Sequence, residues 1–149
     1  MMNRMMCVGA AALLAVVSST AYGAIAPGDN AQEEVQEALI LAEPGSTIEF
    51  AAGTFHFTSS LSLDVDGVTL KGAGIDKTVF SFKNQNAGSE GLIVTSDKVT
   101  LRDFAVEDTI GDAIKVKGAD VISFLNIRTE WTGGPKETNG AYGLYPAES

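Results

Sequence analysis

Carboxylate side chains gather in one short stretch of the sequence, with an arginine on either side. The carboxylates are Asp103, Glu107, Asp108 and Asp112, and the arginines are Arg102 and Arg128. Carboxylates that lie together can bind calcium, or can act as an acid and a base. Acidic residues are also common at surface turns, where they need no ligand. We predict a metal site formed by Asp108, Asp112 and Glu107, with solvated turns as the alternative.

The segment 130–139 combines an aromatic ring with charges of both signs. It contains Glu130, Trp131 and Lys136, and Tyr142 follows it. A sugar ring can stack its apolar face on an aromatic side chain while its hydroxyls bond to charged neighbours. We therefore predict a substrate-binding site formed by Trp131, Glu130, Lys136 and Tyr142. The alternative is that the aromatic rings pack over the base of their own loop.

Three other patterns have simpler interpretations. Gly72-Ala73-Gly74 is followed by an alternating strand pattern and not by a helix, which argues against a dinucleotide site. His56 stands alone between two phenylalanines, so we expect it to face solvent. Lys115 and Lys117 alternate with apolar residues and should project outward, to a solvated face or to the carboxylate of a uronate sugar.

Charge and length narrow the class of protein. The chain has 149 residues, which suits one domain, and its formal net charge is −9. A chain this acidic repels nucleic acid and anionic lipid. We expect no nucleic-acid partner. The acidity would suit divalent cations, or a soluble exported surface.

Residues 1–23 have the order of a secretory signal peptide. A single basic residue, Arg4, precedes an apolar run at 8–17, and small residues follow as far as Gly23. The run is too short for a membrane-spanning helix. We expect cleavage before Ala24, export to the periplasm or the extracellular space, and no membrane insertion after cleavage. Because Cys7 would be removed, the mature chain would contain no cysteine.

The elements that must position these residues begin with one helix. Apolar residues at helical spacing predict a helix over about 30–43, which Pro44-Gly45 ends. Asn30 and Glu33 have the spacing of a capping box. From about residue 46 onward the pattern changes to short alternating runs separated by Gly, Asp, Asn and Ser, which indicates many short strands.

Three of these runs repeat one phrase: "DGVTLKGAGI", "DKVTLRDFAV" and "DVISFLNIRT". The last two are about 22 residues apart, a spacing typical of solenoids, with three short strands in each triangular coil. Equivalent side chains should then stack inward, namely Val68, Val99 and Ile122, with Leu70, Leu101 and Phe124 beside them. Asp66, Asp97 and Asp120 should serve turns, although stacked carboxylates could also bind calcium.

The segment 31–82 resembles the opening of pectate-lyase-like right-handed parallel β-helix proteins, with a helix, a Pro-Gly turn, a "GTF" strand and "GVTLKGAG". The resemblance implies an all-β fold, a right-handed parallel β-helix (solenoid) with an N-terminal capping α-helix. Residues 24–149 would then be the N-terminal part of a longer β-helix domain. Lyases of this group use carboxylates for calcium and an arginine to take a sugar proton, which nominates Arg102 or Arg128. The Asn-Thr-Asp and Gly-His-Gly motifs of polygalacturonases are absent.

These observations lead to one functional expectation and one alternative. We expect an exported protein that acts on or binds acidic polysaccharide, with lyase-like or epimerase-like chemistry, calcium as the candidate cofactor and no assigned catalytic residue. The alternative is a non-catalytic scaffold or binding module of the cell envelope. Whether the protein is an enzyme stays open at this point.

Overall fold

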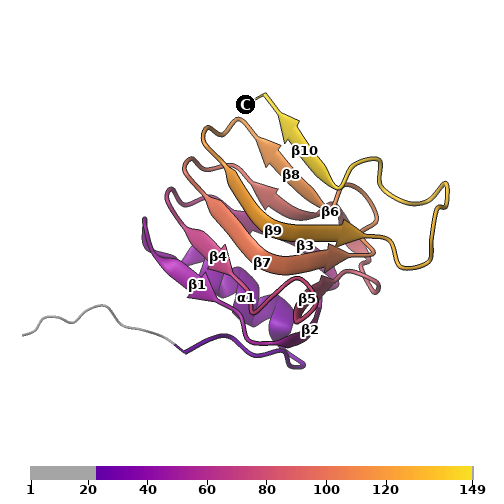
Figure 1. Ribbon diagram of the computed structural model, residues 1–149, viewed down its shortest axis with the longest axis horizontal. Helices are drawn as coiled ribbons and strands as arrows, with labels where there is room; N and C mark the ends of the chain where they lie inside the picture. Colours follow the sequence, from indigo (N-terminus) through magenta and orange to yellow (C-terminus); the bar gives the residue numbers. More distant parts are fainter. Residues whose placement is uncertain (1–22, 149) are drawn as a thin grey trace, which may run out of the picture.

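The computed structural model describes residues 23–148. This part of the chain contains one helix, α1 (Ala31–Ile40), followed by ten strands (Figure 1). The strands are β1 (Thr47–Glu49), β2 (Gly53–His56), β3 (Ser59–Leu63), β4 (Thr69–Lys71), β5 (Thr78–Ser81), β6 (Ala87–Val94), β7 (Thr100–Glu107), β8 (Ile114–Lys117), β9 (Ser123–Glu130) and β10 (Leu144–Ala147).

The strands form two parallel sheets. The larger sheet has the order β1-β4-β7-β5-β2, and β9 pairs with β7 off this path; the smaller sheet has the order β10-β8-β6-β3. The strand β7 has two partners on one side, because its first residues pair with β4 and its last residues pair with β5. This double pairing curls the larger sheet. The two sheets enclose the apolar core between them.

The predicted fold class, an all-β right-handed parallel β-helix with a capping helix, is wrong. The described residues form two parallel sheets, one of them curled like half a barrel, with a single helix, which is a mixed α/β arrangement. The reason lies in β7 and β9, which run for eight residues each through the place where a triangular coil would have a corner. Asp103 (φ 63°) and Asn126 (φ 53°) adopt left-handed backbone there, and they bend these strands without ending them.

The predicted register and inward faces of the repeats are confirmed. Leu101 on β7 lies in register with Leu70 on one side and Phe124 on the other. Val68 and Val99 are fully buried next to this row. Phe124 is only partly buried, because it lies on β9, at the edge of the larger sheet.

Phenylalanine rings fill the curled sheet from within. The ring of Phe80 lies 5.0 Å from Phe50, 5.5 Å from Phe55, 5.3 Å from Phe57 and 4.8 Å from Phe104, measured between ring centroids. All five side chains are buried. His56 is exposed between the buried Phe55 and Phe57, as predicted.

The repeated aspartates hold turns together, which confirms that interpretation. The backbone N–H of Asp97 donates to Asp66 Oδ1 at 2.9 Å, and the N–H of Asp120 donates to Asp97 Oδ1 at 2.9 Å. The carboxylates of Asp66 and Asp97 thus each accept a hydrogen bond from the next turn in the stack. These contacts use the carboxylates for structure.

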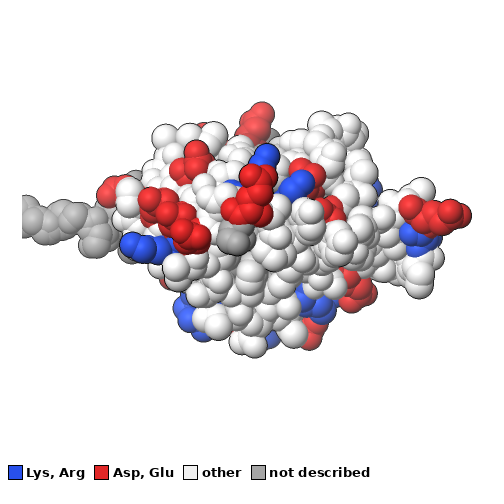
Figure 2. All heavy atoms as spheres, turned by 90° about the horizontal axis from the view of Figure 1, so that it is seen from above, with Lys and Arg blue, Asp and Glu red and all other residues white. Residues whose placement is uncertain are grey.

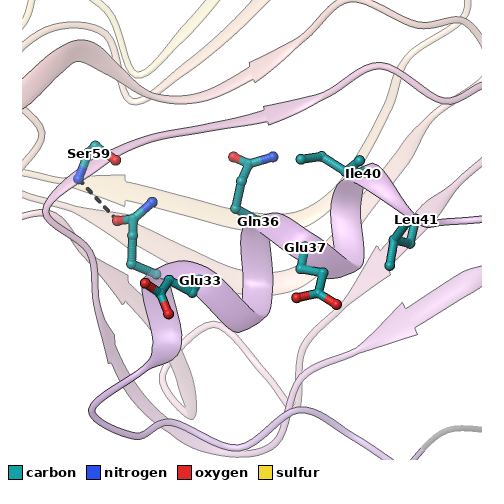
Figure 3. A pocket seen from close by; sticks show the side chains of 7 residues that line it. Glu33, Gln36, Glu37, Ile40, Leu41 and Ser59 are labelled. Atoms are coloured by element: carbon teal, nitrogen blue, oxygen red, sulfur yellow. Dashed lines mark hydrogen bonds between the residues drawn. The ribbon is translucent and has the colours of Figure 1, made fainter.

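The helix α1 covers one end of the molecule. The predicted capping box is wrong, because the side chain of the N-cap residue, Asn30, makes no capping hydrogen bond. Two glutamines of α1 instead bind the free edge of β3. Gln32 Oε1 accepts from the N–H groups of Thr58 and Ser59 at 2.9 and 3.0 Å, and the bond to Ser59 is drawn in Figure 3. Gln36 both donates to Ser62 O and accepts from Ser62 N, each at 3.0 Å.

The side-chain amides of Gln32 and Gln36 form hydrogen bonds with backbone N–H and C=O groups at the edge of β3. A neighbouring strand would otherwise satisfy these groups. We expect Gln36→Ala to destabilise the protein by about 1 to 2 kcal/mol, since two hydrogen bonds are lost. The amide of Ser62 should then exchange its hydrogen faster, as measured by hydrogen exchange. Glu33→Ala is the matched control, and it should leave that exchange rate unchanged. Equal rates in both variants would contradict this role for Gln36.

No helix within residues 23–148 is long and apolar enough to cross a membrane. The predicted signal peptide falls on residues 1–23, which lie outside the described part of the chain apart from Gly23. Export therefore remains a prediction from the sequence.

Candidate functional site

Two of the predicted calcium ligands hold the segment that follows β9. Asp108 Oδ1 accepts from the N–H of Thr132 at 2.7 Å, and Asp108 Oδ2 accepts from Thr132 Oγ1 at 2.8 Å. Asp112 Oδ1 accepts from the N–H of Tyr142 at 3.1 Å. Within residues 23–148 no group of three or more His, Cys, Asp or Glu side chains could hold a metal ion. Calcium binding stays a prediction, and the geometry gives these two carboxylates a structural role.

The third predicted ligand, Glu107, belongs to an ion cluster around Arg128. Arg128 Nη1 lies 2.9 Å from Glu107 Oε2 and 2.8 Å from Glu130 Oε1, and Arg128 Nε lies 3.5 Å from Asp76 Oδ1. Partial burial alone would lower the pKa of Arg128, but the hydrogen bonds and charges of Glu107 and Glu130 raise it overall. Arg128 is therefore held as a cation and is a poor proton acceptor.

Arg102 is also held by a carboxylate. Its Nε lies 2.6 Å from Asp103 Oδ2, and Asn126 Nδ2 donates to Asp103 Oδ1 at 3.1 Å. The hydrogen bonds from Arg102 and Asn126 lower the pKa of Asp103, so this carboxyl group stays ionised. The two arginines that the resemblance nominated as proton acceptors are thus both paired with acids, an arrangement that favours a structural role.

Trp131 anchors the base of its loop. Its indole Nε1 donates to Thr109 O at 2.8 Å, and the side chain is half-buried. The next residue, Thr132, is the one that Asp108 holds. Lys136 is exposed, and the loop between β9 and β10 to which it belongs projects from the body of the molecule (Figure 1). Trp131 and Glu130 are thus engaged with the protein itself, which matches the packing alternative for Trp131.

The fourth predicted residue, Tyr142, belongs to a different arrangement. Its ring stacks on the ring of Tyr145, with 4.9 Å between centroids and 17° between planes. Lys115 Nζ lies 5.5 Å from the centroid of the Tyr145 ring and 3.9 Å from Glu90 Oε2. The side chain of Tyr142 is 52% exposed. We call these four residues, Tyr142, Tyr145, Lys115 and Glu90, the tyrosine shelf.

The smaller sheet explains why these side chains meet. In β8, Ile114 and Val116 are buried, so the alternating Lys115 points outward as predicted. The strand β10 pairs with β8 in a register that places Tyr145 beside Lys115. The predicted site includes Tyr142 but does not pair Tyr145 with Lys115, because that pairing follows from the register of β10 on β8.

A hollow on α1 is the other candidate for a ligand site, but among the described residues that line it there are no stacked aromatic rings beside a cation. Its volume is about 600 Å³, and Ile40, Leu41, Glu33 and Glu37 line it with the two glutamines (Figure 3). Both glutamines are used by β3, and Ile40 and Leu41 offer only hydrocarbon. The tyrosine shelf is therefore the better candidate for a ligand site in the described part of the chain.

Comparisons of the chain with protein-family models, with curated proteins and with solved structures found no match. The resemblance carried by residues 31–82 stays a prediction. The case for a ligand site therefore rests on the geometry of the tyrosine shelf.

Proposed function

We propose that this is an exported protein that binds acidic polysaccharide at the tyrosine shelf. The observation that carries the proposal is the stacked pair of Tyr142 and Tyr145 with Lys115 beside it. An exposed aromatic surface next to a cation and a carboxylate offers the two kinds of contact that a uronate sugar needs. The apolar face of the sugar ring covers an aromatic ring, and the polar groups bind its substituents.

Each member of the shelf has a definite part in this binding. Tyr142 presents the exposed ring on which a pyranose stacks. Lys115 supplies the positive charge for the carboxylate of the uronate, and Glu90 accepts hydrogen bonds from hydroxyl groups. Lys115 is already restrained between Glu90 and Tyr145, so less side-chain freedom is lost when the ligand binds.

Binding without catalysis fits the described residues better than lyase or epimerase chemistry. Those reactions need a group that takes a proton from the sugar ring, and Arg102 and Arg128 are both paired with carboxylates. The one carboxylate of the tyrosine shelf, Glu90, is itself paired with the ammonium group of Lys115, 3.9 Å away. We therefore favour the binding module of the cell envelope over the enzyme.

Tyr142→Ala should weaken binding to polygalacturonate by about 10-fold or more, the scale of one aromatic hot spot. The melting temperature should change little, because the ring is half exposed. Isothermal titration calorimetry with oligogalacturonates measures the affinity. Leu144→Ala, a change of a neighbouring exposed side chain on β10, is the control and should bind like the parent protein. Equal affinity of Tyr142→Ala and the parent protein would contradict the proposal.

Methyl-esterified polygalacturonate separates the two kinds of contact, because it keeps the sugar rings and loses the charges. The parent protein should prefer the free acid, and Lys115→Gln should remove most of that preference while retaining ring stacking. A preference that survives in Lys115→Gln would show that another cation recognises the carboxylate.

A further inference from the structure

We propose that Asp112 is a positioning residue of the tyrosine shelf, because its carboxylate fixes the place from which the ring of Tyr142 meets a ligand. This inference rests on the proposed function, and it adds to the four residues of the shelf one that acts through Tyr142. Tyr142 precedes β10, which begins at Leu144, so its ring is not carried by the strand itself. Other contacts must therefore hold it in place.

Tyr142 stands at the end of the loop that follows β9, and this loop projects from the body of the molecule. Figure 2 shows the projection at the right, where the loop lies in Figure 1, with charged side chains of both signs on it. Residues 135–138 of the loop are all exposed. A segment surrounded by water does not fix the residue at its end, so the contacts at the base of the loop must do so.

Both backbone polar groups of Tyr142 are bound by the turn between β7 and β8. Asp112 Oδ1 accepts from the N–H of Tyr142 at 3.1 Å, and the N–H of Ala113 donates to Tyr142 O at 3.0 Å. Held on both sides of its Cα atom, Tyr142 places its ring 4.9 Å from the ring of Tyr145. The bond from Asp112 is made by a side chain, so a substitution can remove it.

Two glycines bring the end of the loop close enough for these bonds. A side chain at Gly140 would collide with the backbone of Gly111, and a side chain at Gly143 would collide with the side chain of Thr129. The backbone can approach its neighbours this closely only where the residue has no Cβ atom. The chain around Tyr142 therefore lies directly on the turn that carries the carboxylate.

The turn that carries Asp112 is itself held in place. The N–H of Ile110 donates to Gln85 Oε1 at 3.0 Å, and the N–H of Gly91 donates to Asp112 O at 3.0 Å. Gln85 is buried, and its Nε2 donates to Glu90 O at 2.9 Å. Because Glu90 belongs to the tyrosine shelf, one turn links both sides of the shelf. Such support from outside the contact residues preorganises a binding site.

Asp108 shows what a purely structural carboxylate in the same loop does. It binds Thr132 at the start of the loop, accepting from the N–H at 2.7 Å and from Oγ1 at 2.8 Å. Thr132 is not a member of the tyrosine shelf. The two aspartates thus hold opposite ends of one loop, and Asp112 holds the end that carries the ring.

Asp112→Ala and Asp112→Asn form the matched pair that tests this role in the full chain. Both remove the negative charge, but asparagine keeps an oxygen that can accept from the N–H of Tyr142. Asp112→Ala should bind tetragalacturonate at least about threefold more weakly than Asp112→Asn, the scale of one lost hydrogen bond. Asp108→Ala should bind like the parent protein, although it loses two hydrogen bonds from the same loop. Isothermal titration calorimetry measures all four affinities.

The tyrosine rings report on positioning without any ligand. In protein labelled with ¹³C-tyrosine, Asp112→Ala should shift the NMR ring signals of Tyr142 and Tyr145, because stacked rings change each other's resonances. Asp112→Asn and Asp108→Ala should keep the ring signals of the parent protein. A loss of stability alone would not divide the variants in this way.

The outcomes separate this inference from the proposed function. Unmoved ring signals in Asp112→Ala, equal affinities of Asp112→Ala and Asp112→Asn, or an equal loss of affinity in Asp108→Ala would each overturn the inference. The proposed function would still stand if the parent protein binds tetragalacturonate and Tyr142→Ala binds it more weakly. A parent protein that does not bind would overturn the proposed function and, with it, the role of Asp112 in binding.

Discussion

Leu101→Asp should prevent stable folding. Leu101 is fully buried between Leu70 and Phe124, so an aspartate there would place a charge in the apolar core without a partner. The expected loss is at least about 4 kcal/mol, a large part of the stability of a domain this size. Urea unfolding followed by circular dichroism measures the loss.

Leu125→Asp is the matched control, because the same substitution is made on the neighbouring strand at a side chain that is already exposed to water. We expect it to change the free energy of unfolding by about 0.5 kcal/mol or less. If both variants unfolded at the same urea concentration, the inward and outward faces of β7 and β9 would be assigned wrongly.

Phe80→Ala should be the second most damaging substitution discussed here, with a loss of about 3 to 5 kcal/mol. Its ring contacts four other phenylalanine rings, so truncation would leave a cavity that the two sheets cannot fill without moving apart. Differential scanning calorimetry should show a melting temperature lower by tens of degrees, or no transition.

Phe124→Ala provides the comparison for Phe80. The same atoms are removed, but Phe124 lies partly exposed at the edge of the larger sheet. Its truncation should therefore destabilise the protein by much less than that of Phe80. Equal losses would show that the core is not centred on Phe80.

The inward residues could be predicted from the sequence because a strand places alternate side chains on opposite faces. The three repeated segments, which begin at Asp66, Asp97 and Asp120, then indicate which residues of neighbouring strands lie side by side. Leu70, Leu101 and Phe124 were matched by spacing alone, and the structure pairs them. The aspartate turns followed from the same repetition.

The fold class could not be predicted, because a turn-forming residue inside a strand pattern has two outcomes. Asp103 and Asn126 both favour left-handed backbone, which can end a strand at a corner or bend a strand that continues. The period of about 22 residues predicts three short strands in each triangular coil, but a period alone does not distinguish these two outcomes. In the structure the strands continue, and β7 joins β4 and β5 into one curled sheet.

The site was only partly accessible from the sequence. The exposed Tyr142 was named, but the partners of Arg128 depend on contacts between distant segments, such as its bond to Ile75 O across 53 residues. That contact depends on how the loop after β4 lies against β9, which spacing does not reveal. The sequence likewise does not show that Glu130 pairs with Arg128 or that Trp131 donates to Thr109 O. Without these contacts, both residues were candidates for binding a ligand.

The most direct test of the tyrosine shelf observes its two rings while a ligand binds. Besides Tyr22 in the predicted signal peptide, Tyr142 and Tyr145 are the only tyrosines of the chain, so ¹³C-labelled tyrosine reports on the shelf alone after cleavage. Titration with an oligogalacturonate, followed by NMR, should shift the ring signals of Tyr142 and Tyr145 with the same saturation curve that calorimetry gives. Saturable binding that leaves both tyrosine signals unmoved would contradict the account.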